Sequence, residues 1–151
     1  MNYDQLKLEN QLCFPLYAAS RLIIRAYQED LDVLGITYTQ YLVLMVLWES
    51  EVLTVKEIGD KLILNTNTIT PLLKRMEYLQ LLTRKPSKTD KRKVMICITE
   101  QGKNMQIHAA EIPFRLMNKL NITANEGLLA EALDMKNRLY KLIHLLKAIK
   151  E

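Results

Sequence analysis

The sequence predicts a mainly α-helical fold with one small β-hairpin, and three observations support this. The chain has 151 residues, of which 49% are hydrophobic and 25% charged, enough for one domain with a real core. Gly and Pro number only four each, which favours long helices and short connections. The spacing of apolar residues changes from a helical period to strict alternation only around residues 81–99.

The first helix is expected over residues 8–34, where apolar residues recur close to a 3.6-residue period. Pro15 marks its first turn or a kink, and Gly35 is a favourable end for it. A second helix follows over residues 38–50 and is apolar nearly all round. We therefore expect this second helix to be buried.

A short helix and a longer one come next. Thr54 and Glu57 have the spacing of a capping box, which predicts the start of the short helix. Residues 64–80 form the longer helix, capped by Asn65 or Thr66 and tolerating Pro71 only near its start. Its inward side chains are predicted to be Leu72, Leu73, Met76 and Leu79.

Strands are predicted over residues 81–85 and 93–99, joined by the loop of residues 86–91. Helical spacing then resumes over residues 101–120, and Pro113 should kink or break that helix. Thr123 and Glu126 suggest a second capping box before a last helix. The apolar residues of that helix are Leu128, Leu129, Leu133, Leu139, Leu142, Ile143 and Leu146.

Positive charge is concentrated in the predicted hairpin. Residues 84–93 contain six basic residues and one acidic residue, whereas the whole chain has a formal charge of +4. Such a segment is either a solvated loop or a contact for an anionic partner. Two consecutive helices followed by a basic hairpin form a winged helix-turn-helix, whose second helix enters the major groove while the hairpin reaches the backbone or minor groove. Double-stranded DNA is therefore the predicted partner.

Several other classes are disfavoured. The first residues lack the pattern of a signal peptide, and the longest apolar run, residues 42–48, is too short to span a bilayer, so we expect a cytoplasmic protein without a membrane role. There the two cysteines, Cys13 and Cys97, should remain thiols. The sequence offers no metal-ligand cluster, no cofactor motif and no catalytic constellation, which argues against an enzyme such as a thiol peroxidase.

The apolar helices at both ends of the chain need a role of their own. They either close the core of the chain or pair with a second copy, and we favour a homodimer because two reading modules recognise two half-sites of a pseudo-palindromic operator. On this interpretation residues 1–151 form a single domain. Residues of about 1–35 and 101–151 make the dimerisation region, and residues of about 36–100 make the winged helix-turn-helix.

Three blocks resemble MarR-type transcriptional regulators, and more narrowly their organic-hydroperoxide-sensing, OhrR-like branch. They are "KLENQLCFPLYAASR" (residues 7–21), "ITYTQYLVLMVLWE" (36–49) and "TITPLLKRMEYLQLLTRKPSKTDKRKVMICITEQG" (68–102). The Asp-x-Arg pair of the hairpin, Asp90 and Arg92, is common to MarR-type proteins, whereas the cysteine in "NQLCF" is specific to the peroxide-sensing branch. The resemblance covers about two-thirds of the chain and implies a transcriptional regulator, most simply a repressor.

The predicted DNA-contacting residues fall into two groups. Those of the reading helix are short polar residues and two cations at its N-terminal end, with Pro71 among them. Those of the hairpin are cations suited to phosphate oxygens, together with the Asp90–Arg92 pair. The full set is Thr66, Asn67, Thr68, Thr70, Pro71, Lys74, Arg75, Arg84, Lys88, Asp90, Lys91 and Arg92.

Two interpretations of Cys13 stay open from the residues alone. Its apolar neighbours favour an inert, buried thiol, because they raise the thiol pKa. The resemblance instead implies a redox sensor whose thiolate is supported by Tyr27 and Tyr38 of the partner subunit, with Tyr17 nearby. Organic hydroperoxide and a low-molecular-weight thiol would then be the effectors, and Cys97 would be a packing residue. The alternative is a MarR-type repressor released by a small phenolic ligand, with Cys13 structural.

Overall fold

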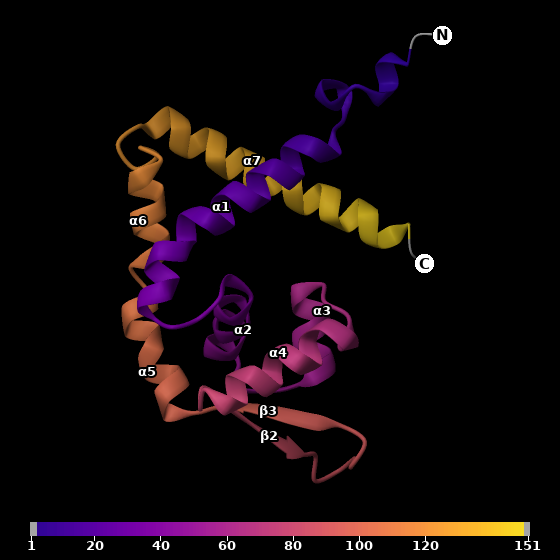
Figure 1. The fold of residues 1–151 in the computed structure, drawn as a ribbon, viewed down its shortest axis with the longest axis vertical. Coiled ribbons are helices and arrows are strands. Elements are labelled where there is room, and N and C mark those ends of the chain that lie inside the picture. Colours follow the sequence, from indigo (N-terminus) through magenta and orange to yellow (C-terminus); the bar gives the residue numbers. More distant parts are fainter. Residues whose placement is uncertain (1–2, 150–151) are drawn as a thin grey trace. The chain divides into compact units, whose positions relative to one another are not determined.

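The structure is a computed structural model that describes residues 3–149, and it divides into two units, the first ending at Ala110 and the second beginning at Glu111. The first unit contains five α-helices and a three-stranded antiparallel sheet in the order β1-β3-β2, so the predicted fold class is confirmed (Figure 1). Its elements are α1 (Cys13–Val33), α2 (Tyr38–Glu49), β1 (Val52–Thr54), α3 (Val55–Leu62), α4 (Thr66–Tyr78), β2 (Leu82–Pro86), β3 (Val94–Ile98) and α5 (Glu100–Ala109), preceded by the 3₁₀ turns Asp4–Leu6 and Leu8–Asn10. The second unit contains α6 (Ile112–Lys119) and α7 (Glu126–Ala148).

The helix α1 begins at Cys13, five residues later than predicted. Pro15 is its third residue, where the missing N–H costs no intrahelical hydrogen bond, so the prediction of a first-turn proline is confirmed. The chain leaves α1 through Gly35, whose φ of +68° suits a residue without a Cβ.

The helix α2 forms the centre of the core of the first unit. A capping box begins it, in which the Thr37 hydroxyl accepts from the Gln40 N–H and the Thr37 N–H donates to Gln40 Oε1 at 2.8 Å. The prediction that this helix is buried is confirmed for half of its twelve side chains. Those buried are Gln40, Tyr41, Val43, Leu44, Val46 and Leu47.

The pair α3 and α4 is built from local signals that were largely predicted. The Thr54–Glu57 capping box is confirmed at the start of α3, and Asn65 caps α4 by accepting from the Thr68 N–H. The inward face of α4 differs from the prediction, since Ile69 is buried and Leu79 is exposed. The reason is that α4 ends at Tyr78, so Leu79 lies beyond the last helical turn.

The hairpin is confirmed, and a third strand joins it. Strands β2 and β3 pair from Leu82–Ile98 to Pro86–Val94, while β1 pairs with the other edge of β3. The three-residue β1 was not predicted. It places the first residues of α3 beside the hairpin, because Thr54 pairs with Met95 and also caps α3.

The break between α5 and α6 agrees with the sequence prediction, whereas the start of α7 differs from it. The predicted break is confirmed, since α5 ends at Ala109 and Pro113 lies in the first turn of α6. The predicted Thr123–Glu126 capping box is wrong. Helix α7 begins only at Glu126, so Asn125 is its cap, and the Thr123 hydroxyl donates to Asn118 Oδ1 instead.

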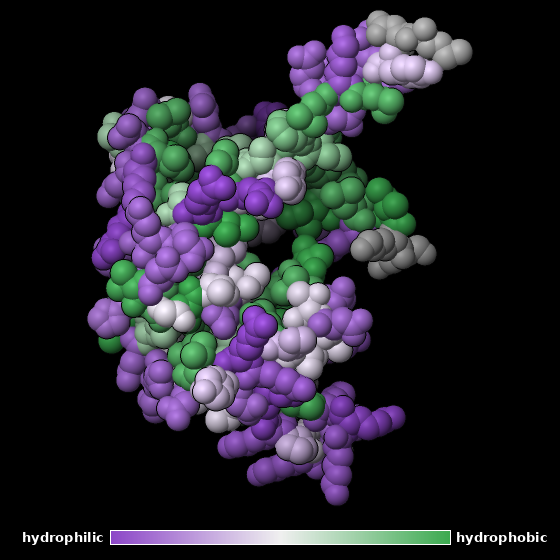
Figure 2. Space-filling model, in the orientation of Figure 1, coloured by the Kyte–Doolittle hydropathy of each residue, from purple (hydrophilic) through white to green (hydrophobic). Residues whose placement is uncertain are grey.

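Apolar side chains remain exposed on the terminal helices of both units. Figure 2 shows hydrophobic residues along α1 and hydrophilic ones around the hairpin. No residue of α7 is buried, although Leu128, Leu133 and Leu139 lie on it. Within residues 3–149, no single helix has the length and hydropathy of a membrane span. Helices α1 and α2 meet these two criteria only when they are taken together across a 75° bend.

Candidate nucleic-acid interface and redox cysteine

The N-terminal end of α4 presents most of the polar residues predicted to read DNA. Asn65 Oδ1 accepts from both the backbone N–H and the hydroxyl of Thr68, each at 2.9 Å, so that hydroxyl already donates within the cap. Thr70 is half-buried. The other predicted residues of this helix are exposed: Thr66, Asn67, Thr68, Pro71, Lys74 and Arg75.

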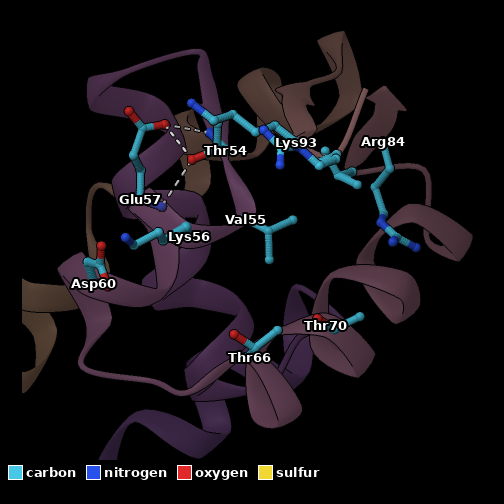
Figure 3. Close-up of a pocket in the computed structure, with 11 residues that line it drawn as sticks. Thr54, Val55, Lys56, Glu57, Asp60, Thr66, Thr70, Arg84 and Lys93 are labelled. Carbon is cyan, nitrogen blue, oxygen red and sulfur yellow. Dashed lines mark hydrogen bonds between the residues drawn. The ribbon is translucent and has the colours of Figure 1, made fainter. Parts of the chain in front are cut away.

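These residues of α4 lie on two sides of the helix. Thr66 and Thr70 line a cavity of about 610 Å³ between α4, the start of α3 and the hairpin (Figure 3). Thr68, Pro71 and Arg75 line a smaller cavity, of about 240 Å³, on the side of Thr39. The single predicted reading surface is therefore split, and only the Thr66 side faces the hairpin.

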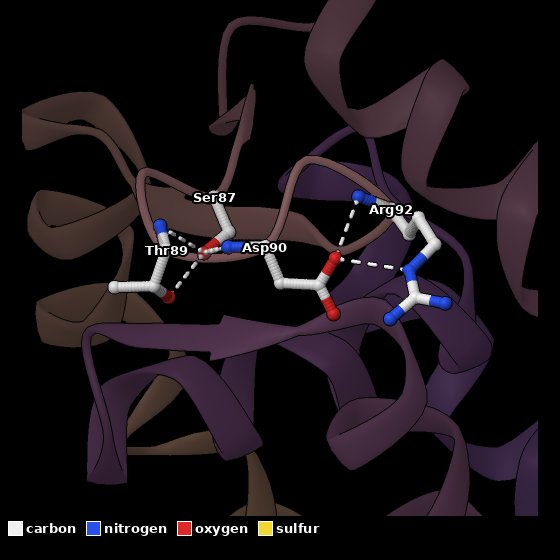
Figure 4. A network of polar contacts seen from close by, with 4 residues as sticks. All are labelled: Ser87, Thr89, Asp90 and Arg92. Atoms are coloured by element: carbon white, nitrogen blue, oxygen red, sulfur yellow. Dashed lines mark hydrogen bonds and ion pairs between the residues drawn. The ribbon is translucent and has the colours of Figure 1, made fainter.

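The hairpin loop is held by a network of polar contacts centred on Ser87 (Figure 4). The buried Ser87 hydroxyl accepts from the N–H groups of Thr89 and Asp90, and the Ser87 N–H donates to the Lys93 carbonyl at 2.9 Å. These bonds give the loop a defined conformation without an apolar core. Lys88 and Lys91 are exposed on it.

The predicted Asp90–Arg92 pair is present within this loop. Asp90 Oδ1 accepts from Arg92 Nε at 3.2 Å and from the Arg92 N–H at 3.1 Å. The side-chain bond and then the backbone bond hold the pKa of Asp90 below its ordinary value, so the carboxylate stays charged at neutral pH. The side chain of Arg92 is 91% exposed. Asp90 orients this side chain through its contact with Nε.

Arg84 differs from the other hairpin cations because it is largely covered. Its side chain is 20% exposed and forms an ion pair with Glu77 of α4 at 3.7 Å, while its backbone N–H donates to Glu77 Oε1 at 2.9 Å. The role of Glu77 was not predicted from the sequence, since seven residues and a change of element separate it from Arg84.

Cys13 is exposed in the chain, together with its apolar neighbours Leu12, Phe14 and Leu16. It is the first residue of α1, and nothing among residues 3–149 buries it. Tyr17 lies one helical turn further on, and its hydroxyl accepts from Arg21 Nη1 at 3.3 Å. A core role for Cys13 within the single chain therefore has no support in this geometry.

Tyr27 and Tyr38, which are half-buried, form an aromatic cluster with the buried Tyr41. The ring centroids of Tyr27 and Tyr38 are 5.3 Å apart, and that of Tyr41 lies 6.1 Å from Tyr27. Burial raises the pKa of Tyr27 and of Tyr38, so both hydroxyls keep their protons at neutral pH and can donate. Tyr27 lies fourteen residues from Cys13 on the same helix, a separation of about 21 Å at 1.5 Å per residue. The two groups therefore do not meet within one chain.

Cys97 lies in the middle of the sheet, opposite Val52 of β1 and Thr83 of β2, and is partly buried. This position agrees with a packing residue. Among residues 3–149, no group of three or more His, Cys, Asp or Glu side chains is placed to hold a metal ion.

The fold and its basic hairpin define the class of winged-helix transcriptional regulators, and comparisons with known proteins give the family. Residues 25–108 match the family described as transcriptional regulator SarA/Rot. The organic hydroperoxide resistance transcriptional regulator of Bacillus subtilis (strain 168) is 46% identical over 144 residues, covering 95% of either chain. The chain belongs to the SarA/Rot family of transcriptional regulators, and its resemblance to the organic-hydroperoxide-sensing branch of MarR-type regulators is confirmed.

Solved structures agree with this assignment. Reduced AbfR bound to DNA, from Staphylococcus epidermidis, superposes with a TM-score of 0.76 at 36% identity, covering 98% of each chain. AbfR is also known in a disulfide form (TM-score 0.68, 36% identity, 93% of this chain and 95% of that one). Overoxidized AbfR bound to DNA has a TM-score of 0.67 at 35% identity, covering 95% of this chain and 99% of that one. Wild-type MarR from E. coli shares the fold, with a TM-score of 0.71 at 21% identity over 85% and 96% of the two chains.

Proposed function

We propose that this protein is a homodimeric, operator-binding transcriptional repressor that an organic hydroperoxide releases from DNA by oxidising Cys13. The observation that carries the proposal is the exposed thiol at the start of a helix whose apolar side chains have no cover in the described chain. An exposed apolar surface of this kind is typical of a subunit interface. A thiol placed there is open to an apolar oxidant and, once modified, disturbs the assembly.

DNA is the partner best matched by the other end of the first unit. The start of α4 offers exposed threonine and asparagine side chains to base edges, and the loop offers Lys88, Lys91 and Arg92 to phosphates or the minor groove. One such module makes too few contacts for a specific site, so a dimer on a pseudo-palindromic operator is expected. The DNA-bound state of AbfR supports this proposal.

The two regions proposed from the sequence fit this arrangement. Residues of about 36–100 would read DNA, and residues of about 1–35 and 101–151 would form the dimerisation region of a single regulatory domain. In a dimer, Tyr27 and Tyr38 of the partner subunit would donate to the Cys13 sulfur, since those of the same chain lie too far away. Such donors favour the thiolate, which is the reactive form.

The proposed chemistry has two steps. The Cys13 thiolate attacks the peroxide oxygen of ROOH, the O–O bond breaks, and with one proton the products are a sulfenic acid and the alcohol ROH. A low-molecular-weight thiol then attacks the sulfenic sulfur, giving a mixed disulfide and water. We favour the mixed disulfide as the species that releases DNA, because it adds bulk where two helices pack. The disulfide form of AbfR supports a disulfide product in general, and its overoxidized form bound to DNA supports the view that added oxygen alone does not release DNA.

A binding titration tests the proposal. A duplex selected from a random pool by the reduced protein is labelled, and fluorescence anisotropy follows its binding before and after cumene hydroperoxide and glutathione. We expect the dissociation constant to rise about 5- to 150-fold, the range of ordinary allosteric coupling, and to return after dithiothreitol. Selection that recovers no duplex would remove the DNA-binding proposal, and unchanged binding after oxidation would remove the redox part.

The assembly state is a separate prediction. The exposed apolar residues of α1 and α7 should be covered by a second copy, so the protein is expected to be a dimer at micromolar concentration. Light scattering coupled to size exclusion measures the mass directly. Leu22→Glu places a charge on the exposed apolar part of α1 and should shift the mass toward the monomer. A wild-type monomer under these conditions would contradict the homodimer.

The hairpin provides a third test. Arg92→Ala is expected to weaken binding to the selected duplex about 10- to 100-fold, because it removes one good groove contact. Asp90→Asn should have a smaller effect, since it keeps an oxygen for the Arg92 N–H but loses the ion pair. Equal affinity and an equal salt slope for Arg92→Ala and wild type would exclude the loop from the interface.

A further inference from the structure

We infer that the cavity between α4 and the hairpin binds one particular DNA phosphate, the one on the strand that separates the major groove from the minor groove, with Arg84 as its receptor and Glu77 as the residue that positions Arg84. The inference rests on the proposed DNA binding and adds to it. It gives Arg84 a role different from that of Lys88 and Lys91, although the sequence analysis placed all three among the DNA-contacting cations.

The shape of the cavity carries the first step. It has a volume of about 610 Å³ and is lined on one side by Thr66 and Thr70 of α4 and on the other by Arg84, Arg92 and Lys93 of the hairpin. Figure 3 shows the two threonines along α4, with Arg84 of β2 and Lys93 of the loop before β3 on the hairpin side. A helix in the major groove and a hairpin in the neighbouring minor groove straddle a single sugar–phosphate backbone. The cavity lies where that backbone has to pass.

The charges around the cavity carry the second step. Four cations line it, namely Lys56, Arg84, Arg92 and Lys93, against two carboxylates. Of these carboxylates, Glu57 accepts at Oε2 from both the Thr54 N–H and the Thr54 hydroxyl in the capping box of α3. These bonds hold the pKa of Glu57 below its ordinary value. An excess of cations around a cavity that open hydroxyl groups also line suits a phosphate diester.

The environment of Arg84 carries the third step. Its guanidinium forms an ion pair with Glu77 at 3.7 Å, too long for a hydrogen bond, and its Nε is buried with no hydrogen-bond partner among the residues described. A planar guanidinium held by so long an ion pair can present its outer nitrogens to the oxygens of a phosphate in a bidentate way. Because Glu77 also accepts from the Arg84 backbone N–H, it fixes the strand and the cation relative to α4.

Other hairpin cations are placed differently. Lys88 and Lys91 are exposed on the loop and do not line the cavity. They therefore suit diffuse attraction to the backbone, which a neighbouring lysine can replace. Arg84 should instead depend on one phosphate, and that difference can be measured.

The experiment scans the backbone of the selected duplex with neutral methylphosphonates, one position at a time, and measures binding of the full-length protein by anisotropy. In wild type, one position between the two grooves is expected to weaken binding about tenfold, the size of one good contact. In Arg84→Met, which keeps the apolar stem of the side chain, the same position should change affinity by no more than about twofold. Lys88→Met is the matched control, and it should keep the full tenfold loss.

Glu77→Gln tests the positioning role. It keeps an oxygen for the Arg84 N–H but removes the charge that holds the guanidinium, so the loss at the critical phosphate should fall to about threefold while thermal unfolding stays unchanged. Arg84→Gln replaces Arg84→Met if the latter does not fold. A tenfold loss that persists in both Arg84 variants, or that disappears in Lys88→Met, would overturn the assignment. Selection that yields no bound duplex would instead overturn the proposed DNA binding, and this inference with it.

Discussion

Cys13→Ser is expected to bind the selected duplex within about twofold of wild type and to stay bound after treatment with organic hydroperoxide. Serine is close to cysteine in size, and its more polar hydroxyl is accommodated at an exposed helix start, so neither α1 nor the reading helix should change. Serine forms no sulfenic acid or disulfide, and the release step therefore has no chemical beginning. Wild type under the same conditions should lose at least about fivefold in affinity.

Two controls make this result specific. Cys97→Ser should be released like wild type, because Cys97 lies within the sheet opposite Thr83 and Val52 and not on α1. Tyr27→Phe and Tyr38→Phe should bind DNA and respond more slowly, because in the proposed dimer each would remove a hydroxyl donor to the partner's sulfur. Continued release of Cys13→Ser by the hydroperoxide would end the sensing proposal. Release of wild type by a phenolic ligand alone would favour the alternative type of effector.

The reactivity of the thiol gives an independent measurement. Cys13 of wild type should be alkylated by iodoacetamide at neutral pH faster than Cys13 of Leu22→Glu, because disruption of the dimer would withdraw the hydroxyls proposed to support the thiolate. Equal alkylation rates in the two proteins would mean that the tyrosines do not act on the thiol.

Most of the fold could be predicted because its signals are local. The Thr54–Glu57 capping box, the stop at Gly35 and the break at Pro113 each depend on residues within one helical turn. Strand β1 could not be found in this way, since its three residues pair only with β3, more than forty positions later. The cap of α7 was misplaced by two residues because Thr123 and Asn125 offer equivalent local signals.

The candidate site divides in the same way. Asp90 and Arg92 are two residues apart, so their contact could be predicted from the spacing, and the structure contains this contact. Arg84 was grouped with the other hairpin cations because its cover depends on Glu77 in another element. The Tyr27–Tyr38–Tyr41 cluster likewise forms between two helices, and only their packing shows the burial that raises the pKa of these phenols.

Replacing Gly102 with alanine should destabilise the protein more than any other exchange of glycine for alanine. A Cβ at Gly102 would lie 2.3 Å from the Leu81 carbonyl oxygen and 2.9 Å from a side-chain carbon of Ile98. The Leu81 carbonyl cannot move easily, because it accepts from the Thr99 N–H at 3.1 Å, and the Gly102 carbonyl is itself held by Trp48 Nε1 at 2.9 Å.

We expect Gly102→Ala to lower the free energy of unfolding by about 3 kcal/mol, the upper end for overpacking a core, in urea titrations at fixed protein concentration. Gly127→Ala is the matched control, since its Cβ would meet only the Asn125 side-chain oxygen, at 3.2 Å, in the first turn of α7. Alanine favours helix there, so this variant should stay within about 1 kcal/mol of wild type. Gly102 lies at the start of α5, directly after β3. A backbone shift that relieves the clash would therefore move β3, which is one of the two strands of the hairpin. Gly102→Ala protein that still folds should therefore also bind DNA more weakly, whereas equal stability of the two variants would show that the start of α5 yields without cost.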